Sequence, residues 1–206
     1  ISLDSLQTER FKAITRIGDL DTVLRGIDRA VECGFDRIRL NAVILDGLNR
    51  DEVVPLTHYA LERGIHIAFI EEMPLGQVNV GGKPLAYVSS DTLQEELAKH
   101  FTLVPMTPSD TAGPARDFLI AGSQTQVGFI SPHSHNFCAQ CNRLRISAEG
   151  RLLMCLGNEE SIDLRGLLRA GSTDEEIKTT IIESLSIKPE RHVFDQPEEP
   201  QILRFM

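Results

Sequence analysis

The sequence has no apolar run that approaches the roughly 20 residues needed to cross a bilayer, and no charged and then apolar leader at its start. We therefore expect a soluble, cytoplasmic protein with no membrane partner. Basic residues are outnumbered, 21 against 30 acidic ones, and the net charge of −9 argues against indiscriminate nucleic-acid binding. An anionic ligand must then be bound by individually placed arginines.

Cysteine is scarce as well, and its placement does not suit a disulfide framework. Of the four cysteines, Cys33 stands alone at the end of an apolar helical pattern, where we expect a buried thiol. The other three, Cys138, Cys141 and Cys155, lie in "FCAQCNRLRISAEGRLLMC". This clustering predicts a metal site.

The spacing Cys138-x2-Cys141-x13-Cys155 is compatible with two kinds of metal site. A structural zinc ion takes four tetrahedral ligands, and His133 or His135 would supply the fourth. An iron–sulfur cube held by three cysteines would leave one iron open to a substrate atom. Spacing alone leaves both open, and unliganded buried thiols are a third, weaker reading.

Two features beside the cysteines add to this picture. "SAEG" predicts a turn at 149–150 between strands at 143–147 and 151–155, which would fold Cys155 back towards the other two thiols. Arg143 and Arg145 occupy alternate positions of the first of these strands, so both guanidinium groups should face one space. A single arginine is most often a solvated surface charge, but two guanidinium groups beside a metal ligand favour a polyphosphate as the bound ligand.

The chain divides into two parts by its patterns, and 206 residues are enough for one domain and a smaller one. Residues 1–74 alternate strand-like and helical patterns, which is typical of parallel β/α units in a barrel or an open sheet. Ligands in such folds lie at the C-terminal ends of the strands, here 2–4, 41–45 and 71–73. Residues 75–206 contain short strands, turns and short helices, and are expected to form a second domain.

Several segments together resemble a known family, in order and across nearly the whole chain. They are "ISLDSL", "RLNAVILDGLNRDE", "FIEEMPLG", "GPAR", "VGFISP", "FCAQCNRLRISAEGRLLMCL" and "KPERH". They resemble the C-terminal two thirds of the GTP 3′,8-cyclases, radical S-adenosylmethionine enzymes that begin molybdenum cofactor biosynthesis. The resemblance implies an α/β fold in which the C-terminal half of an incomplete (βα)6 TIM-like barrel precedes a mixed α+β domain.

The resemblance also implies chemistry, cofactors and partners. The family are lyases that convert GTP to (8S)-3′,8-cyclo-7,8-dihydroguanosine 5′-triphosphate with a radical generated from S-adenosylmethionine. One 4Fe-4S cluster, on an N-terminal C-x3-C-x2-C motif, makes the radical, and a second, near the C-terminus, binds GTP through its open iron. A homodimer is compatible with the family, and cyclic pyranopterin monophosphate synthase would be the downstream functional partner.

Carried over position by position, Cys138, Cys141 and Cys155 match the ligands of the second 4Fe-4S cluster. The positions that match the GTP site or face its cavity are Arg143, Arg145, Arg39 and Asn41. Ser2 and Met73 match positions that line the S-adenosylmethionine site. The radical-generating cysteines are absent from the chain, so no residue is assigned as catalytic and we expect the chain by itself to be inactive.

Some residues differ from those that the family has at the same positions, and others could have a structural role and no part in a binding site. Arg39 replaces a family lysine, Ala68 replaces a family arginine, and the chain ends at Phe205–Met206 without the family's pair of glycines. Met73 alone would more often fill a core, whereas an amide such as Asn41 within an apolar strand needs partners. One of Glu71 and Glu72 could accept a hydrogen bond from a cofactor amine.

Two other functions stay open on the sequence. The first is a zinc-stabilised structural or nucleotide-binding module without catalysis, and the second is a related radical enzyme with a different substrate.

Overall fold

The computed structural model describes residues 1–73, 79–80, 83–84, 87–107, 113–158, 160–192 and 194. The chain divides into two compact units, Ile1–Met73 with Val78–His135, and Pro74–Gln77 with Asn136–Met206. This division differs from the boundary expected at 74/75, because strands beyond residue 100 complete the sheet of the first unit. The chain end, where the family's glycine pair was sought, lies outside the described residues.

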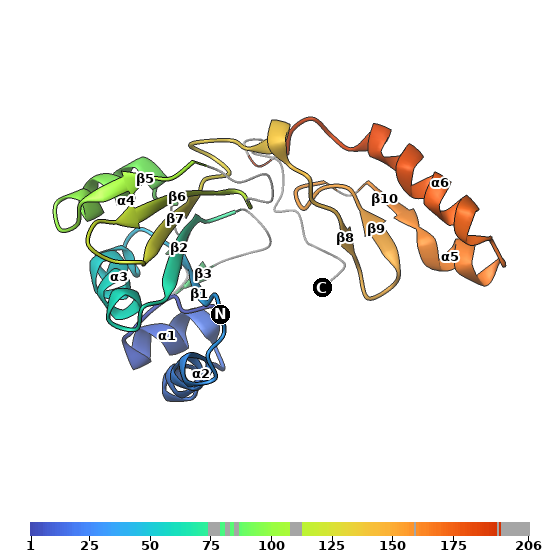
Figure 1. The fold of residues 1–206 in the computed structure, drawn as a ribbon. Coiled ribbons are helices and arrows are strands. Elements are labelled where there is room, and N and C mark those ends of the chain that lie inside the picture. Colours follow the sequence, from blue (N-terminus) through green and yellow to red (C-terminus); the bar gives the residue numbers. More distant parts are fainter. Residues whose placement is uncertain are drawn as a thin grey trace. The chain divides into compact units, whose positions relative to one another are not determined.

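The first unit is a mixed α/β structure (Figure 1). Its five-stranded sheet has the order β1-β2-β7-β6-β5. Strands β1, β2 and β7 are parallel, and β6 and β5 are antiparallel additions. The strands are β1 Arg39–Ile44, β2 His66–Glu71, β5 Leu103–Pro105, β6 Ala115–Ile120 and β7 Gln126–Ile130, and a separate pair is formed by β3 Asn79–Val80 and β4 Lys83–Pro84.

The strand expected at 1–4 is reduced to a single parallel bridge between Ser2 and Asn41. The helices of the first unit are α1 Thr8–Thr15, α2 Leu20–Glu32, α3 Val53–Glu62 and α4 Ser90–Ala98. Among the described residues, no helix is long and apolar enough to cross a membrane.

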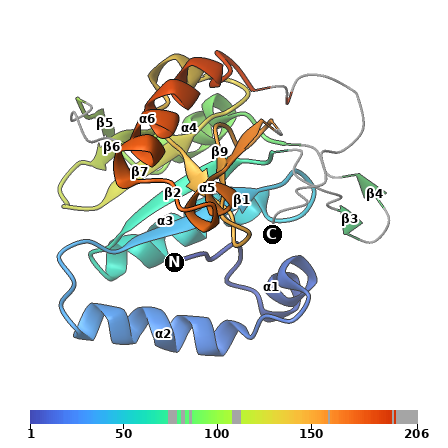
Figure 2. The same cartoon turned by 90° about the vertical axis from the view of Figure 1, so that its right-hand side faces the viewer.

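One face of this sheet is the core, and all four helices pack on it. Alternation along β1 points Leu40, Ala42 and Ile44 into a cluster that also contains residues of each helix, for example Ile27 of α2 and Leu56 of α3. Figure 2 shows α1 and α2 lying below the sheet of this unit. None of these four helices covers the opposite face of the sheet, which we call the uncovered face.

Cys33 does not occupy the buried position expected for it. It is the C-terminal cap of α2 and is exposed. The apolar stripe of α2 includes Val31, which packs against the core, and Cys33 lies about 200° further round the helix. The side chain therefore points away from the core.

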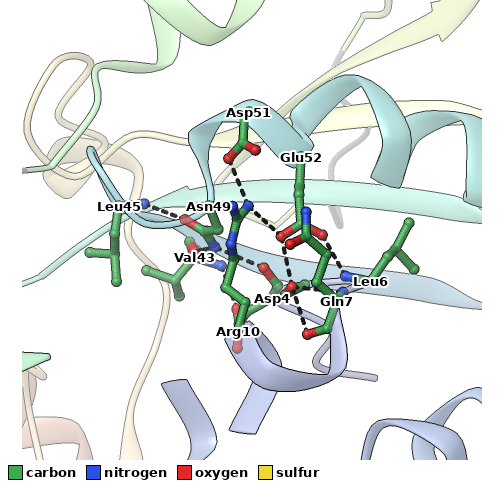
Figure 3. Close-up of polar contacts among 10 residues, drawn as sticks. Asp4, Leu6, Gln7, Arg10, Val43, Leu45, Asn49, Asp51 and Glu52 are labelled. Carbon is green, nitrogen blue, oxygen red and sulfur yellow. Dashed lines mark hydrogen bonds and ion pairs between the residues drawn. The ribbon is translucent and has the colours of Figure 1, made fainter. Parts of the chain in front are cut away.

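A buried amide joins the start of the chain to the end of β1 (Figure 3). Asn49 is fully buried, and its side-chain oxygen accepts from the backbone N–H of Leu45 at 2.8 Å. Its amide nitrogen donates to the carbonyl oxygens of Asp4 and Val43, both at 2.8 Å. Three segments are thus held by one side chain.

The buried carboxylate of Glu52 also binds residues near the start of the chain (Figure 3). Glu52 is the last residue of the 3-10 helix η1, Arg50–Glu52. Glu52 accepts from the Ser5 hydroxyl at 2.7 Å and from the Leu6 N–H at 2.6 Å. Arg10 donates to Glu52 and to Asp51, both at 2.7 Å. The network fixes residues 4–10 beside the C-terminal end of β1.

We expect Asn49→Ala to lower the free energy of unfolding by about 2 kcal/mol, because it leaves buried backbone groups at 43 and 45 without partners. Urea denaturation followed by circular dichroism measures the change. Gln124→Ala, which removes an exposed amide between β6 and β7, is the matched control. Equal midpoints for the two variants would show that the network contributes nothing to stability.

The second unit contains a three-stranded antiparallel sheet of order β10-β9-β8 with two helices beside it (Figure 1). Its small core consists of Leu152, Met154 and Leu164. A capping box between Thr173 and Glu176 begins the longer helix. The elements are η2 Cys138–Gln140, β8 Arg145–Ile146, β9 Arg151–Leu153, β10 Ser161–Asp163, α5 Leu164–Arg169, α6 Asp174–Ser184 and η3 Leu185–Ile187.

Candidate functional site

Two of the three clustered cysteines lie at the ends of one turn. Cys138 opens η2, and the backbone N–H of Cys141 donates to the carbonyl of Cys138 at 3.0 Å. The side chain of Asn136 accepts from the Cys138 N–H at 2.8 Å, which fixes the entry to the turn. All three thiols are free and half-buried.

The turn expected at 149–150 is confirmed. Gly150 has φ 77°, its N–H donates to the Ser147 carbonyl at 2.9 Å, and β8 pairs with β9 in antiparallel register. The chain therefore reverses its direction between β8 and β9, and Cys155 follows β9. Within the described residues, however, no three His, Cys, Asp or Glu side chains are arranged to hold a metal ion. The convergence of the three thiols therefore stays a prediction.

The two histidines considered as a fourth zinc ligand are engaged inside the first unit. The His133 ring stacks on Tyr87 with 4.7 Å between centroids, and its Nε2 lies 2.8 Å from the Glu72 carbonyl oxygen. His135 Nε2 lies 2.7 Å from the Asp91 carboxylate. Zinc binding through Nε2 of either imidazole would have to break these contacts.

Arg143 and Arg145 differ in their surroundings. Only Arg145 lies in β8, where it is exposed, whereas Arg143 precedes the strand and is half-buried. Burial lowers the pKa of Arg143, the nearby Cys141 opposes this, and the charge of Arg145 lowers it further. A guanidinium that is partly desolvated and close to a second positive charge gains from a bound anion.

A row of paired residues crosses the uncovered face of the first sheet. Ser2 pairs with Asn41, Asn41 with Ala68, Ala68 with Gly128, and Gly128 with Asp117. Asn41 is thus half-buried on the uncovered face and does not enter the apolar core, which explains an amide within an apolar strand. The row places an expected S-adenosylmethionine residue, Ser2, directly beside an expected GTP residue.

Arg39 reaches over this row, and sequence reasoning missed its partner. Its Nη2 lies 2.7 Å from Asp117 Oδ1, and both side chains are about three-quarters buried. Asp117 Oδ1 is only 2.5 Å from where a Cβ on Gly128 would stand, and the Cβ atoms of Ala115 and Ala68 follow at 3.2 and 3.5 Å. The lack of a side chain at Gly128 therefore makes room for the Asp117 carboxylate that pairs with Arg39.

We expect this ion pair to be measurable as a coupling of about 1 kcal/mol in a double-mutant cycle of Arg39→Ala and Asp117→Ala, because both groups are largely shielded from water. Urea denaturation of the four proteins measures it. The exposed pair of Arg29 with Glu32 is the control and should couple more weakly. Additive effects of Arg39→Ala and Asp117→Ala would contradict the arrangement.

Glu71 ends β2 and is fully buried. Its carboxylate accepts from the backbone N–H groups of Ser90 at 2.8 Å, His133 at 2.9 Å and Ser134 at 3.0 Å, and from the Ser134 hydroxyl. These four donors match the acceptor sites of a carboxylate, so Glu71 is not available to a cofactor amine. Met73, two residues further on, is half-buried.

Burial and hydrogen bonding shift the pKa of Glu71 and of Glu72 in opposite directions. Burial raises the pKa of Glu71, but the Ser134 hydroxyl and the three backbone donors outweigh this and leave its pKa below the ordinary value. Burial also raises the pKa of Glu72, and the electrostatic effect of His133 opposes this only in part. Of the two carboxylates, Glu72 is the one still suited to a cofactor amine.

Residues 65–194, more than half of the chain, match the Molybdenum Cofactor Synthesis C family. The chain belongs to this family, as the cysteine and arginine motifs predicted. The match begins within the first unit and includes both the sheet strands β2, β6 and β7 and the cysteine hairpin.

The relatives have a more specific name. The chain is 51% identical over 207 residues to the GTP 3′,8-cyclase of Saccharophagus degradans, and 53% identical over 208 residues to that of Pseudomonas putida strain W619. The GTP 3′,8-cyclase of Ectopseudomonas mendocina is 51% identical over 207 residues. All of this chain aligns in each case, and it spans 62% of the length of each relative.

Proposed function

We propose that the chain is the C-terminal part of a GTP 3′,8-cyclase, with the C-terminal half of a TIM-like barrel in its first unit and a cluster-binding unit after it. The parallel strands β1, β2 and β7 support the barrel assignment, and the named relatives support the activity. A cytoplasmic setting, a homodimer and a downstream pyranopterin synthase belong to the same proposal.

The second unit is proposed to hold a 4Fe-4S cluster through Cys138, Cys141 and Cys155. Three free, half-buried thiols on a turn and the hairpin that follows it are the right donor set, and both candidate histidines have other partners. When bound, the cluster supplies an open iron to which the purine of GTP can coordinate. The chain's own residues orient the remainder of the nucleotide.

The observation on which the nucleotide assignment chiefly rests is the half-buried Arg143 beside Arg145 and Cys141. In a chain of net charge −9, two guanidinium groups next to the cysteine turn suit the triphosphate. Arg39 and Asn41 are proposed to contact GTP from the uncovered sheet face. Ser2 and Met73 are proposed to line the S-adenosylmethionine site.

Anaerobic reconstitution with iron and sulfide tests this function. We expect absorbance near 400 nm, where iron–sulfur proteins absorb and zinc proteins do not, and binding of GTP to the reconstituted protein in calorimetry. Cys155→Ser should lose the absorbance, and Cys33→Ser, which changes the isolated exposed thiol, should keep it. Stoichiometric zinc without such absorbance would establish the zinc module instead.

We further expect that this chain alone does not cleave S-adenosylmethionine. Its clustered cysteines provide one three-thiolate set, and Cys33 has no neighbouring cysteine in the sequence with which to form another. Chromatography for 5′-deoxyadenosine after reconstitution and reduction measures the reaction. Formation of this product above the level of the Cys155→Ser variant would contradict the assignment of the cysteines.

A further inference from the structure

The ammonium group of Lys188 joins the two chain segments that bear Cys141 and Cys155. Lys188 Nζ donates to the carbonyl oxygen of Arg143 at 2.8 Å and to that of Met154 at 2.7 Å. It also lies 3.8 Å from Cys141 Sγ. Arg143 is two residues after Cys141, and Met154 immediately precedes Cys155.

The local sequence explains why this lysine leaves the helical region at the right place. Helix α6 ends at Ser184 and η3 at Ile187, and Lys188 has the extended conformation φ −62°, ψ 121°. Pro189 follows, and the residue before a proline is restricted to extended conformations. Lys188 therefore cannot continue the helix, and its side chain reaches back to the cysteine hairpin of the same unit.

The contacts use the ammonium group fully. An ammonium has three donors, and here two meet carbonyl oxygens of different segments while the third direction faces a thiol. The half-buried position makes each of these bonds stronger than on the surface. Loss of the lysine would free the loop at Arg143 from the strand end at Met154.

We propose that Lys188 is a positioning residue of the metal site, which fixes the spacing of Cys141 and Cys155 and places a positive charge beside the sulfur of Cys141. The inference rests on the proposed iron–sulfur function. Residues that orient metal ligands commonly change metal affinity by about 10- to 100-fold when they are removed. A positive charge beside a ligand sulfur also favours the reduced, more negative state of a cluster.

The test compares full-length variants of this chain after anaerobic reconstitution. Lys188→Met keeps the length of the side chain and removes its charge and donors, Lys188→Arg keeps the charge, and Lys178→Met is the control. Lys178 is exposed on α6, and its ammonium lies 3.7 Å from the carboxylate of Glu175. The readouts are the rate at which a chelator removes iron, the reduction potential of the bound cluster, and the melting temperature of the metal-free protein.

We expect Lys188→Met to lose iron about tenfold faster than the parent and to have a more negative reduction potential. Lys188→Arg should recover most of the potential, and Lys178→Met should match the parent in all readouts. If Lys188→Met fails to fold, Lys188→Gln, which retains a donor without charge, takes its place in the comparison.

Parental iron retention and reduction potential in Lys188→Met would overturn the proposal, and so would a lowered melting temperature of this variant with an unchanged potential. Failure of the parent protein itself to assemble a cluster would count against the proposed function, and it is recognised before any variant is compared. A parent protein that binds only zinc would also count against the proposed function.

Discussion

Arg145→Ala should raise the dissociation constant of GTP about tenfold or more while leaving the cluster absorbance intact. A charge-assisted hydrogen bond to a phosphate contributes about 1.5 to 3 kcal/mol, and each 1.4 kcal/mol is a factor of ten in affinity. Arg145 is exposed in β8, so the fold should tolerate the change.

The effect should grow when Arg143 is changed as well, to about a hundredfold for the double variant if the two contributions add. Arg143 is half-buried and its pKa is lowered, chiefly by burial, so it gains more from a bound anion than a surface arginine does. The salt dependence of binding should weaken with each arginine removed.

Calorimetric titration of GTP into the reconstituted proteins at two salt concentrations measures both quantities. Arg169→Ala, at the exposed end of α5, is the control for a general loss of positive charge. Equal affinities in the parent and both arginine variants would mean that Arg143 and Arg145 are ordinary surface charges.

Glu71→Gln should lower the free energy of unfolding by about 4 kcal/mol at neutral pH. The glutamine side chain has the same shape, but its amide nitrogen would face backbone N–H donors that now meet a carboxylate oxygen. Several buried donors would then lack acceptors at once. Glu72→Gln is the control at the next position, where burial already disfavours the charged carboxylate, so the change should be small.

The difference between the parent and Glu71→Gln should depend on pH. Because the folded-state pKa of Glu71 is lowered, its contribution is fully present above its unfolded pKa of about 4.5 and is lost as the pH falls through the folded value. Urea midpoints of both proteins measured from pH 7 down to pH 3 should therefore approach each other at the acidic end. A difference that stays constant over this range would show that Glu71 is not stabilised as a carboxylate.

The sequence by itself determined the family and most of the local structure. Periodicity indicated the alternation of strands and helices in residues 1–74, and the glycine of "SAEG" located the hairpin before Cys155, because these features depend on neighbouring residues. The motif "FCAQCNRLR" carried the resemblance to the family for the same reason, because its residues are neighbours in the sequence, whereas its spacing alone left zinc and an iron–sulfur cluster open. It did not predict where the first unit ends, because the strands that complete its sheet follow in the chain only after residue 100.

Contacts between distant residues were decided by the tertiary structure alone. Asp117 meets Arg39 across 78 positions of sequence, and Glu71 receives its donors from residues 19 to 63 positions away. Lys188 reaches the cysteine hairpin over 34 to 47 positions. No sequence pattern specifies such partners, because sheet register and helix packing bring them together only after the chain has folded. The residues that orient the site thus depend on the fold, whereas the residues proposed to do its chemistry were visible in the sequence.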